Sequence, residues 1–240
     1  MMSTDITILL FTAASIGFLH TLTGPDHYLP FIVMSKARNW NTGKTLWITF
    51  LCGLGHVGSS VVIGILGIAL GLGVKKLEVV ESFRGNLAAW AFVAFGFIYF
   101  LWGLWKALKG KPHKHIHLHN NGSIHVHQHQ HAEISTHNHG HNNEKPINLT
   151  PWILFTVFVL GPCEPLIPLL MYPAAKIHVG AIVIAAVIFS IVTIATMMTI
   201  VVLTMKGINF LPMKVFEKYM HALAGAVICL SGCAIVFLGL

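Results

Sequence analysis

Apolar residues dominate this chain in long runs separated by charged residues. Six runs contain no Asp, Glu, Lys or Arg and hold 20, 30, 21, 18, 29 and 22 residues, covering 6–25, 45–74, 85–105, 146–163, 177–205 and 219–240. About 20 apolar residues are enough for a helix to cross a bilayer. The fourth run is interrupted by Glu164 and resumes over 165–175. This pattern predicts an all-α polytopic membrane protein with six transmembrane helices.

The composition agrees with that prediction. Only 10% of the 240 residues are charged and 55% are hydrophobic, with a mean hydropathy of +0.74. Soluble domains usually contain about 25% charged residues, so an ordinary soluble fold is excluded. No Lys or Arg precedes Lys36, and the start therefore lacks the basic region of a signal peptide. We expect it to form the first spanning helix.

The basic residues are distributed unevenly between the two expected sides of the membrane. With six spans, one side carries 4 of the 15 Lys and Arg residues and the other carries 11. The positive-inside rule places the richer side in the cytoplasm. Both termini are then expected outside, and the formal charge of +7 needs no nucleic-acid partner to explain it.

The first apolar run ends in a polar break. His20 is followed by Gly24-Pro25 and then by Asp26 and His27. Ionisable residues are costly inside a membrane and mark a substrate or ion pathway by default, and a Gly-Pro break is tolerated where it lines a cavity. In a continuous helix the two histidines would lie about 10.5 Å apart along the axis. Either they serve different positions on a path, or the break draws them together. The alternative is that Asp26 caps a half-helix and the histidines pack as hydrogen-bonded core.

The second run contains one histidine, His56, among small residues that allow close helix approach. We expect this approach to bring His56 against the broken helix as a ligand or pathway group. An interhelical hydrogen bond is the alternative.

The fourth run ends in Gly161-Pro162-Cys163 and is followed by Glu164-Pro165, and this stretch echoes the first break. Gly161-Pro162 matches Gly24-Pro25, and Cys163-Glu164 matches Asp26-His27. This echo divides the chain into two three-helix halves, 1–108 and 151–240. Because each half has an odd number of spans, the second half is inverted in the membrane relative to the first. Paired broken helices in such repeats point to the binding site. Glu164 is a candidate ligand, and Cys163 is either a thiolate ligand or apolar packing.

Between the halves, 109–150 is rich in histidine and has no apolar pattern, so we expect a disordered cytoplasmic loop. Neutral imidazole binds zinc, copper, nickel and cobalt. The alternating spacing provides many weak, exchangeable positions for gathering metal: His113, His115, His117, His119, His125, His127, His129, His131, His137, His139 and His141.

Other polar residues are expected to have ordinary roles. Glu78, Glu81 and Arg84 form a solvated or interfacial connection between the second and third helices, and His221 is interfacial. All four cysteines fall in apolar runs, which does not resemble a secreted disulfide framework.

At these motifs the chain resembles the nickel/cobalt efflux (RcnA-like, NicO) and UreH-like membrane proteins and, more distantly, nickel/cobalt permeases. The resemblance rests on His20 with Asp26-His27, on His56 with its preceding glycines, on 161–165, and on the His-rich loop. It implies a six-helix transporter of Ni²⁺ or Co²⁺ with the His and Asp residues of helix 1 in the metal path.

The sequence therefore predicts a transporter and not an enzyme. Its substrate is a divalent transition-metal ion, Ni²⁺ or Co²⁺ with Zn²⁺ as a further candidate, and it has no permanent cofactor. The expected ligands are His20, Asp26, His27, His56, Cys163 and Glu164. Export through a bacterial inner membrane is favoured because the loop faces the cytoplasm. The oligomeric state stays open, a homo-oligomer included.

Three alternatives stay open beside transport of a metal. A sulfite-type anion exporter would use half-helix N-termini, although Asp26 and Glu164 would repel an anion there. A transmembrane thiol electron carrier would need facing cysteines, but Cys163 has Asp26 as its counterpart. A metal-storage or maturation protein would use the His-rich loop.

Overall fold

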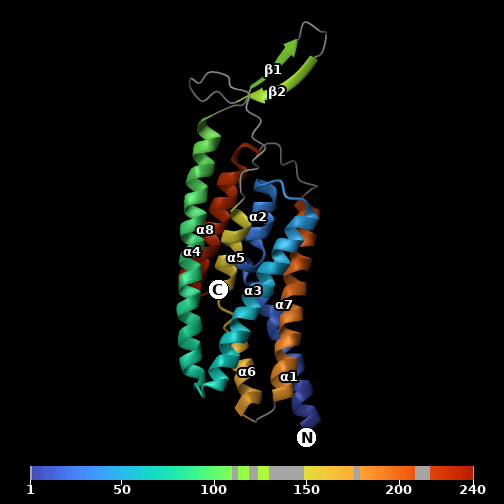
Figure 1. Ribbon diagram of the computed structural model, residues 1–240, viewed down its shortest axis with the longest axis vertical. Helices are drawn as coiled ribbons and strands as arrows, with labels where there is room; N and C mark the ends of the chain where they lie inside the picture. The colour runs from blue at the N-terminus through green and yellow to red at the C-terminus, as the bar shows by residue number, and fades with distance from the viewer. Residues whose placement is uncertain are drawn as a thin grey trace.

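The computed structural model describes residues 2–109, 113–118, 124–129, 149–175, 179–208 and 217–239. Within these ranges, five helices are long and apolar enough to cross a membrane, which makes the chain a helical integral membrane protein. They run side by side in one elongated bundle (Figure 1). They are α1 (Met2–Thr23), α3 (Thr42–Ala69), α4 (Val74–Lys109), α7 (Val179–Ile208) and α8 (Met220–Leu238), the last preceded by the 3₁₀ turn η3 (Glu217–Tyr219). In lipid, a helix satisfies every backbone polar group within its own segment.

Both predicted breaks are confirmed. After α1, Gly24 is extended and Pro25 opens a 3₁₀ turn, η1 (Pro25–His27), before the short helix α2 (Leu29–Ala37). In the second half, α5 (Thr150–Leu160) stops at the extended Gly161, and α6 (Leu166–Ala175) follows. Proline suits the first turn of the new segment because its missing N–H has no partner there anyway.

The expected bounds of two helices were wrong. The first begins at Met2, earlier than the predicted Ile6, and its first turn includes Asp5, which the helix dipole favours at that end. The second error concerns Glu78, Glu81 and Arg84, which are not a connection. They lie inside α4, which starts at Val74 and runs for 36 residues. Glu81 and Arg84 sit one turn apart and pair on the same face, so their charges do not end the helix.

Helix pairs give the bundle its framework. α1 packs against α7, and α3 packs against α5, α6 and α7. The longest contact runs between α4 and α8, where glycines bring the backbones together: a Cβ on Gly96 would meet the backbone of Cys229, and one on Gly225 would meet that of Phe100. Small residues serve this purpose in membrane helices.

A short hairpin lies within the His-rich segment. Strands β1 (His113–Leu118) and β2 (Ile124–His129) pair antiparallel, with His115 opposite His127. It lies at the end of the bundle opposite the N-terminus (Figure 1). The side chains of this segment and the rest of 110–148 lie outside the described residues, so the metal-gathering role of the loop histidines stays a prediction.

Candidate metal centre

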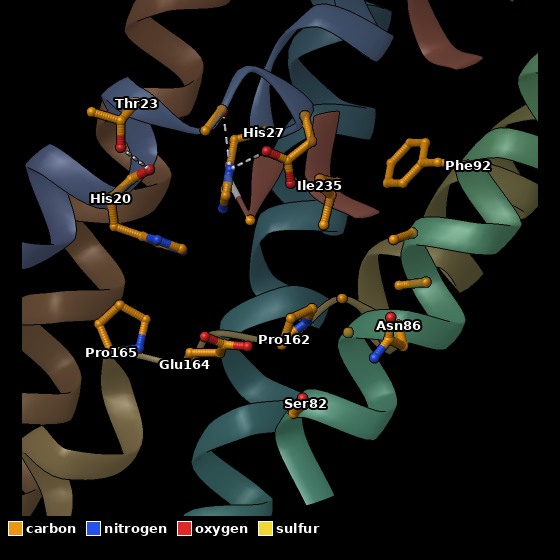
Figure 2. Close-up of a pocket in the computed structure, with 17 residues that line it drawn as sticks. His20, Thr23, His27, Ser82, Asn86, Phe92, Pro162, Glu164, Pro165 and Ile235 are labelled. Carbon is orange, nitrogen blue, oxygen red and sulfur yellow. Dashed lines mark hydrogen bonds and ion pairs between the residues drawn. The ribbon is translucent and has the colours of Figure 1, made fainter. Parts of the chain in front are cut away.

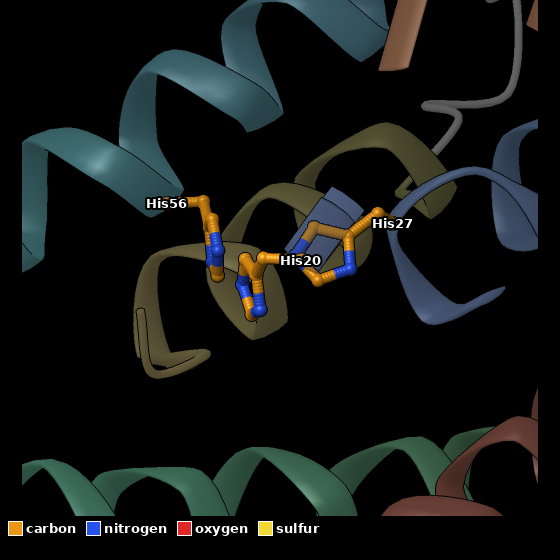
Figure 3. A group of neighbouring side chains, drawn as sticks. All are labelled: His20, His27 and His56. Carbon is orange, nitrogen blue, oxygen red and sulfur yellow. The ribbon is translucent and has the colours of Figure 1, made fainter. Parts of the chain in front are cut away.

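Three histidines from separate segments converge in the middle of the bundle. His20 comes from the last turn of α1, His27 from η1 and His56 from α3. Their candidate ligand nitrogens all lie within 4.8 Å of one another, and Figure 3 shows the three rings gathered at one point. Two nitrogens bound to one metal at about 2.1 Å each are at most about 4.2 Å apart, so a small closure would bring the three onto one ion.

The break in the first helix is what brings His20 and His27 together. Their ring centroids are 4.7 Å apart, against about 10.5 Å along the axis of an unbroken helix. The ring of His56 lies 5.0 Å from that of His27 and 6.4 Å from that of His20. Of the two sequence-based interpretations, the one in which the break unites the histidines is confirmed.

All three histidines present an unused nitrogen. The Nε2 atoms of His20, His27 and His56 are buried and have no hydrogen-bond partner. Burying a polar atom without a partner costs free energy, so three such atoms on neighbouring rings are costly without a ligand. A bound cation would satisfy all three at once.

Hydrogen bonds on the other side of the His27 ring fix its proton. Its Nδ1 lies 3.1 Å from the Gly24 carbonyl oxygen and 3.2 Å from Asp26 Oδ1. Neither a carbonyl nor an ionised carboxylate can donate, so Nδ1 carries the hydrogen and Nε2 keeps its lone pair. A carboxylate that orients a metal-binding histidine in this way also raises its basicity. The structure thus places Asp26 behind the ligand His27 and outside the three-histidine group.

His56 lies beside the second break. A Cβ on Gly161 would come 3.2 Å from both His56 Nδ1 and the Phe158 carbonyl oxygen, and the ring centroids of His56 and Phe158 on α5 are 6.2 Å apart. His56 is 3% exposed, and it connects the first half of the chain to the break in the second.

A cavity of about 490 Å³ opens beside the histidines. Glu164 lies on its wall together with His20, Asp26 and His27, as Figure 2 shows for His20, His27 and Glu164. The second break therefore contributes a carboxylate to the same space as the first. The cavity leaves room for water or a further ligand at a metal held by the histidines.

Sequence reasoning missed two polar residues of this wall. Ser82 and Asn86 on α4 both line the cavity. They are four residues apart and so share a helix face, and this spacing at the start of an otherwise apolar run was the available signal.

Cys163 is not brought to the histidines. It is fully buried and packs with Leu166, Leu170 and Phe189 in an apolar cluster. Among the described residues, one group of three potential metal ligands is present, and it contains neither Cys163 nor Glu164. For Cys163, the geometry favours the packing alternative.

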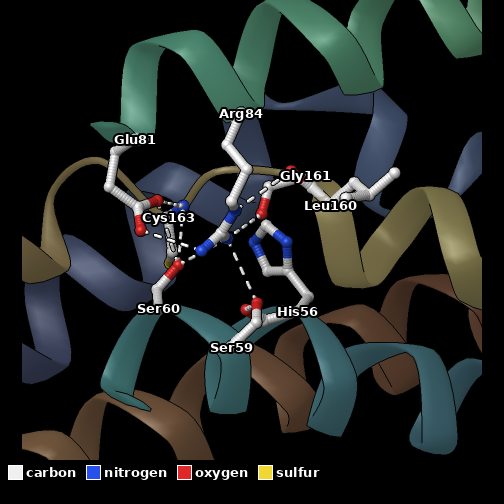
Figure 4. Close-up of polar contacts among 8 residues, drawn as sticks. All are labelled: His56, Ser59, Ser60, Glu81, Arg84, Leu160, Gly161 and Cys163. Carbon is white, nitrogen blue, oxygen red and sulfur yellow. Dashed lines mark hydrogen bonds and ion pairs between the residues drawn. The ribbon is translucent and has the colours of Figure 1, made fainter. Parts of the chain in front are cut away.

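A buried ion pair holds the second break. Arg84 donates from Nε to the Leu160 carbonyl oxygen at 3.2 Å and from Nη2 to the Gly161 carbonyl oxygen at 2.7 Å. Its Nη1 donates to Glu81 at 2.9 Å, and Glu81 is fully buried. The Cys163 N–H lies 3.3 Å from Glu81 Oε2. Figure 4 shows the network, in which Ser59 and Ser60 of α3 also accept from Arg84.

A scan against protein-family models, a search of curated proteins and a search of solved structures each found no match to this chain. The site is therefore interpreted from its own geometry.

Replacing Arg84 with Leu should strongly destabilise the protein, because it removes the counter-ion of the buried Glu81 and the side-chain donor to the carbonyl oxygens of Leu160 and Gly161. Removing one partner of a buried ion pair costs about 3–5 kcal/mol. Thermal unfolding in detergent would measure this. Lys76→Leu, an exposed position on the same helix, is the control and should change little. Adding Glu81→Gln to Arg84→Leu should recover part of the loss, and equal stability of Arg84→Leu and wild type would contradict the role of the network.

Asp26→Asn should weaken metal binding by about 10- to 100-fold, the usual effect of losing a carboxylate behind a ligand histidine. His56→Ala, which removes a ligand, should weaken it further. Titration with Ni²⁺ against a competing chelator would measure both, in a background where the eleven loop histidines are replaced by Ser. Thr196→Ala is the matched control on α7. Unchanged affinity in His56→Ala would rule out the three-histidine site.

Proposed function

We propose that the protein transports a divalent transition-metal ion across a membrane, Ni²⁺ or Co²⁺ first and Zn²⁺ as a further candidate. The observation that supports this most directly is the group of three histidines at a helix break inside an apolar bundle, whose candidate ligand nitrogens lie within 4.8 Å of one another and whose Nε2 atoms have no hydrogen-bond partner. Imidazole nitrogen suits all three of these metals.

The open cavity favours transport over structural metal binding. Structural zinc sites usually have four protein ligands and are closed. Here two of the three histidines, His20 and His27, face a cavity that is also lined by Asp26 and Glu164. An ion could bind with water in its remaining positions, and the carboxylates would favour its positive charge. Such a site can both take up and release an ion.

The helix packing supports two inverted repeats of three spans each. If α1–α2, α3 and α4 are equated with α5–α6, α7 and α8, the main contacts occur in matching pairs. The contact of α1 with α7 matches that of α3 with α5, α2 with α3 matches α6 with α7, and α2 with α8 matches α4 with α6. The α4–α8 contact maps onto itself. The broken pairs α1–α2 and α5–α6 would then each be one span, and rocking of the halves would expose the site alternately to each side.

The distribution of charge supports export. With six spans, 11 of the 15 Lys and Arg residues fall on the side of the His-rich loop, and the positive-inside rule then favours a cytoplasmic position for that side. In a bacterial inner membrane the His-rich loop would then gather metal from the cytoplasm and deliver it to the site.

Transport of an anion fits the site less well. The cavity is lined by the carboxyl groups of Asp26 and Glu164 and by the rings of His20 and His27. Ionised carboxylates and the lone pairs of neutral imidazoles would both repel an anion. A thiol electron carrier is disfavoured as well, because Cys163 is sealed in an apolar cluster.

Purified protein in liposomes should move Ni²⁺ or Co²⁺ down a gradient, reported by a metal-quenched dye trapped inside. His27→Ala should slow this flux by about tenfold or more, since it removes a ligand at the crossing point. Thr196→Ala and the variant without loop histidines should still transport, the latter with a lower apparent affinity on the loop side. Flux of Ni²⁺, Co²⁺ and Zn²⁺ no faster than in empty liposomes, or equal flux in His27→Ala and wild type, would contradict the proposal.

A further inference from the structure

Unpartnered buried donors mark a second place in the molecule. Besides the three histidine nitrogens, the atoms without a partner include Arg38 Nε and Trp40 Nε1. Both lie on the connection between α2 and α3. An N–H of Arg or Trp can only donate a hydrogen bond, so what is missing here is an acceptor. This is the opposite chemistry to the metal centre.

Two cations gather there. The guanidinium carbon of Arg38 lies 5.7 Å from the centroid of the Trp102 ring, and Lys106 Nζ lies 5.2 Å from the same centroid. Within the described residues, Asp26 lies against His27 and Glu81 pairs with Arg84, and no carboxylate of this part of the chain forms an ion pair with Arg38 or Lys106.

The acceptor atoms of this cluster, on His221 and Tyr99, already receive hydrogen bonds from within the cluster. Lys106 Nζ can only donate, so it donates to His221 Nε2 at 3.2 Å. The proton of a neutral His221 then lies on Nδ1, which donates to the Tyr99 hydroxyl at 2.8 Å. The guanidinium carbon of Arg38 lies 5.5 Å from the centroid of the Tyr99 ring. The Tyr99 O–H and the remaining N–H groups of Arg38 and Lys106 are left as donors for a ligand.

The cluster sits at the depth of lipid headgroups. Trp102 and Trp105 are 39% and 54% exposed, and Lys109 Nζ lies 4.3 Å from the Trp105 centroid. Exposed Trp beside Lys at a helix end is typical of the membrane–water interface. The cluster lies where α2 and α4 end and α8 begins, which is the hairpin end of the bundle in Figure 1.

We propose that Arg38, Tyr99, Lys106 and Trp102 bind the phosphate of an anionic phospholipid headgroup between α2, α4 and α8. Basic pockets between transmembrane helices bind such headgroups, and the planar donors of Arg match phosphate oxygens. Because α2 directly follows the first break, a lipid bound here connects the segment after that break to α4 and α8. This proposal does not depend on metal transport.

Delipidated protein in a non-ionic detergent provides the test. Short-chain phosphatidylglycerol, short-chain phosphatidylcholine and inorganic phosphate are added separately, and bound lipid is counted by native mass spectrometry alongside the melting temperature. Phosphatidylglycerol should bind and raise the melting temperature, whereas phosphatidylcholine should do so much less. The double variant Arg38→Gln/Lys106→Gln should bind phosphatidylglycerol more weakly by about five-fold for each cation removed.

Lys75→Gln/Lys76→Gln removes the same charge from exposed positions at the other end of α4 and should bind as wild type does. If the Arg38 variant does not fold, Lys106→Gln alone tests the same site, since Lys106 is exposed. Equal binding of the two lipids, or an equal loss in the Lys75/Lys76 control, would overturn the proposal. Inorganic phosphate at millimolar concentration giving the same stabilisation would assign the site to a free anion and overturn the lipid assignment.

Discussion

The satisfaction of backbone polar groups at two helix breaks is the constraint on which the rest of the structure depends. Inside a bilayer no water reaches an unpaired carbonyl or N–H group. At the first break, the Gly24 carbonyl oxygen receives the Nδ1–H of His27. At the second, the carbonyl oxygens of Leu160 and Gly161 receive Arg84. At each break, a side chain donates a hydrogen bond to a backbone carbonyl oxygen. These hydrogen bonds fix the orientations of the His27 and Arg84 side chains, and thereby the geometry of the site.

The two breaks contribute differently. At the first, the Gly24 carbonyl oxygen accepts both the backbone N–H and the ring Nδ1–H of His27, while the other ring nitrogen has no partner, so the same residue stabilises the break and offers a candidate ligand. At the second, an arginine supplies the donors, and its charge is balanced by a buried glutamate. His56 lies between them, with Gly161 so close that an added Cβ would come 3.2 Å from its ring. Because of this asymmetry, the described residues contain one group of three histidines and no second group at the other break.

The sequence was informative where polar residues occur inside an apolar run, because burying them is costly. His20, His27 and Gly24-Pro25 stood out because polar residues and a break in an apolar run are costly, and the structure brings both histidines together. The error at Glu81 and Arg84 has the opposite cause. Charged residues beside a run also occur in loops, and only the fold shows that α3 and the second break bury them. Likewise, no local sequence pattern shows whether Cys163 is a metal ligand or an apolar packing residue.

X-ray absorption at the nickel edge tests the central claim most directly. Protein in which the loop histidines are replaced by Ser would be loaded with one equivalent of Ni²⁺. The three-histidine centre predicts a nitrogen and oxygen shell with the multiple scattering of three imidazoles, reduced to two in His56→Ala. A sulfur neighbour, or a shell without imidazole, would place the ion elsewhere and contradict the account.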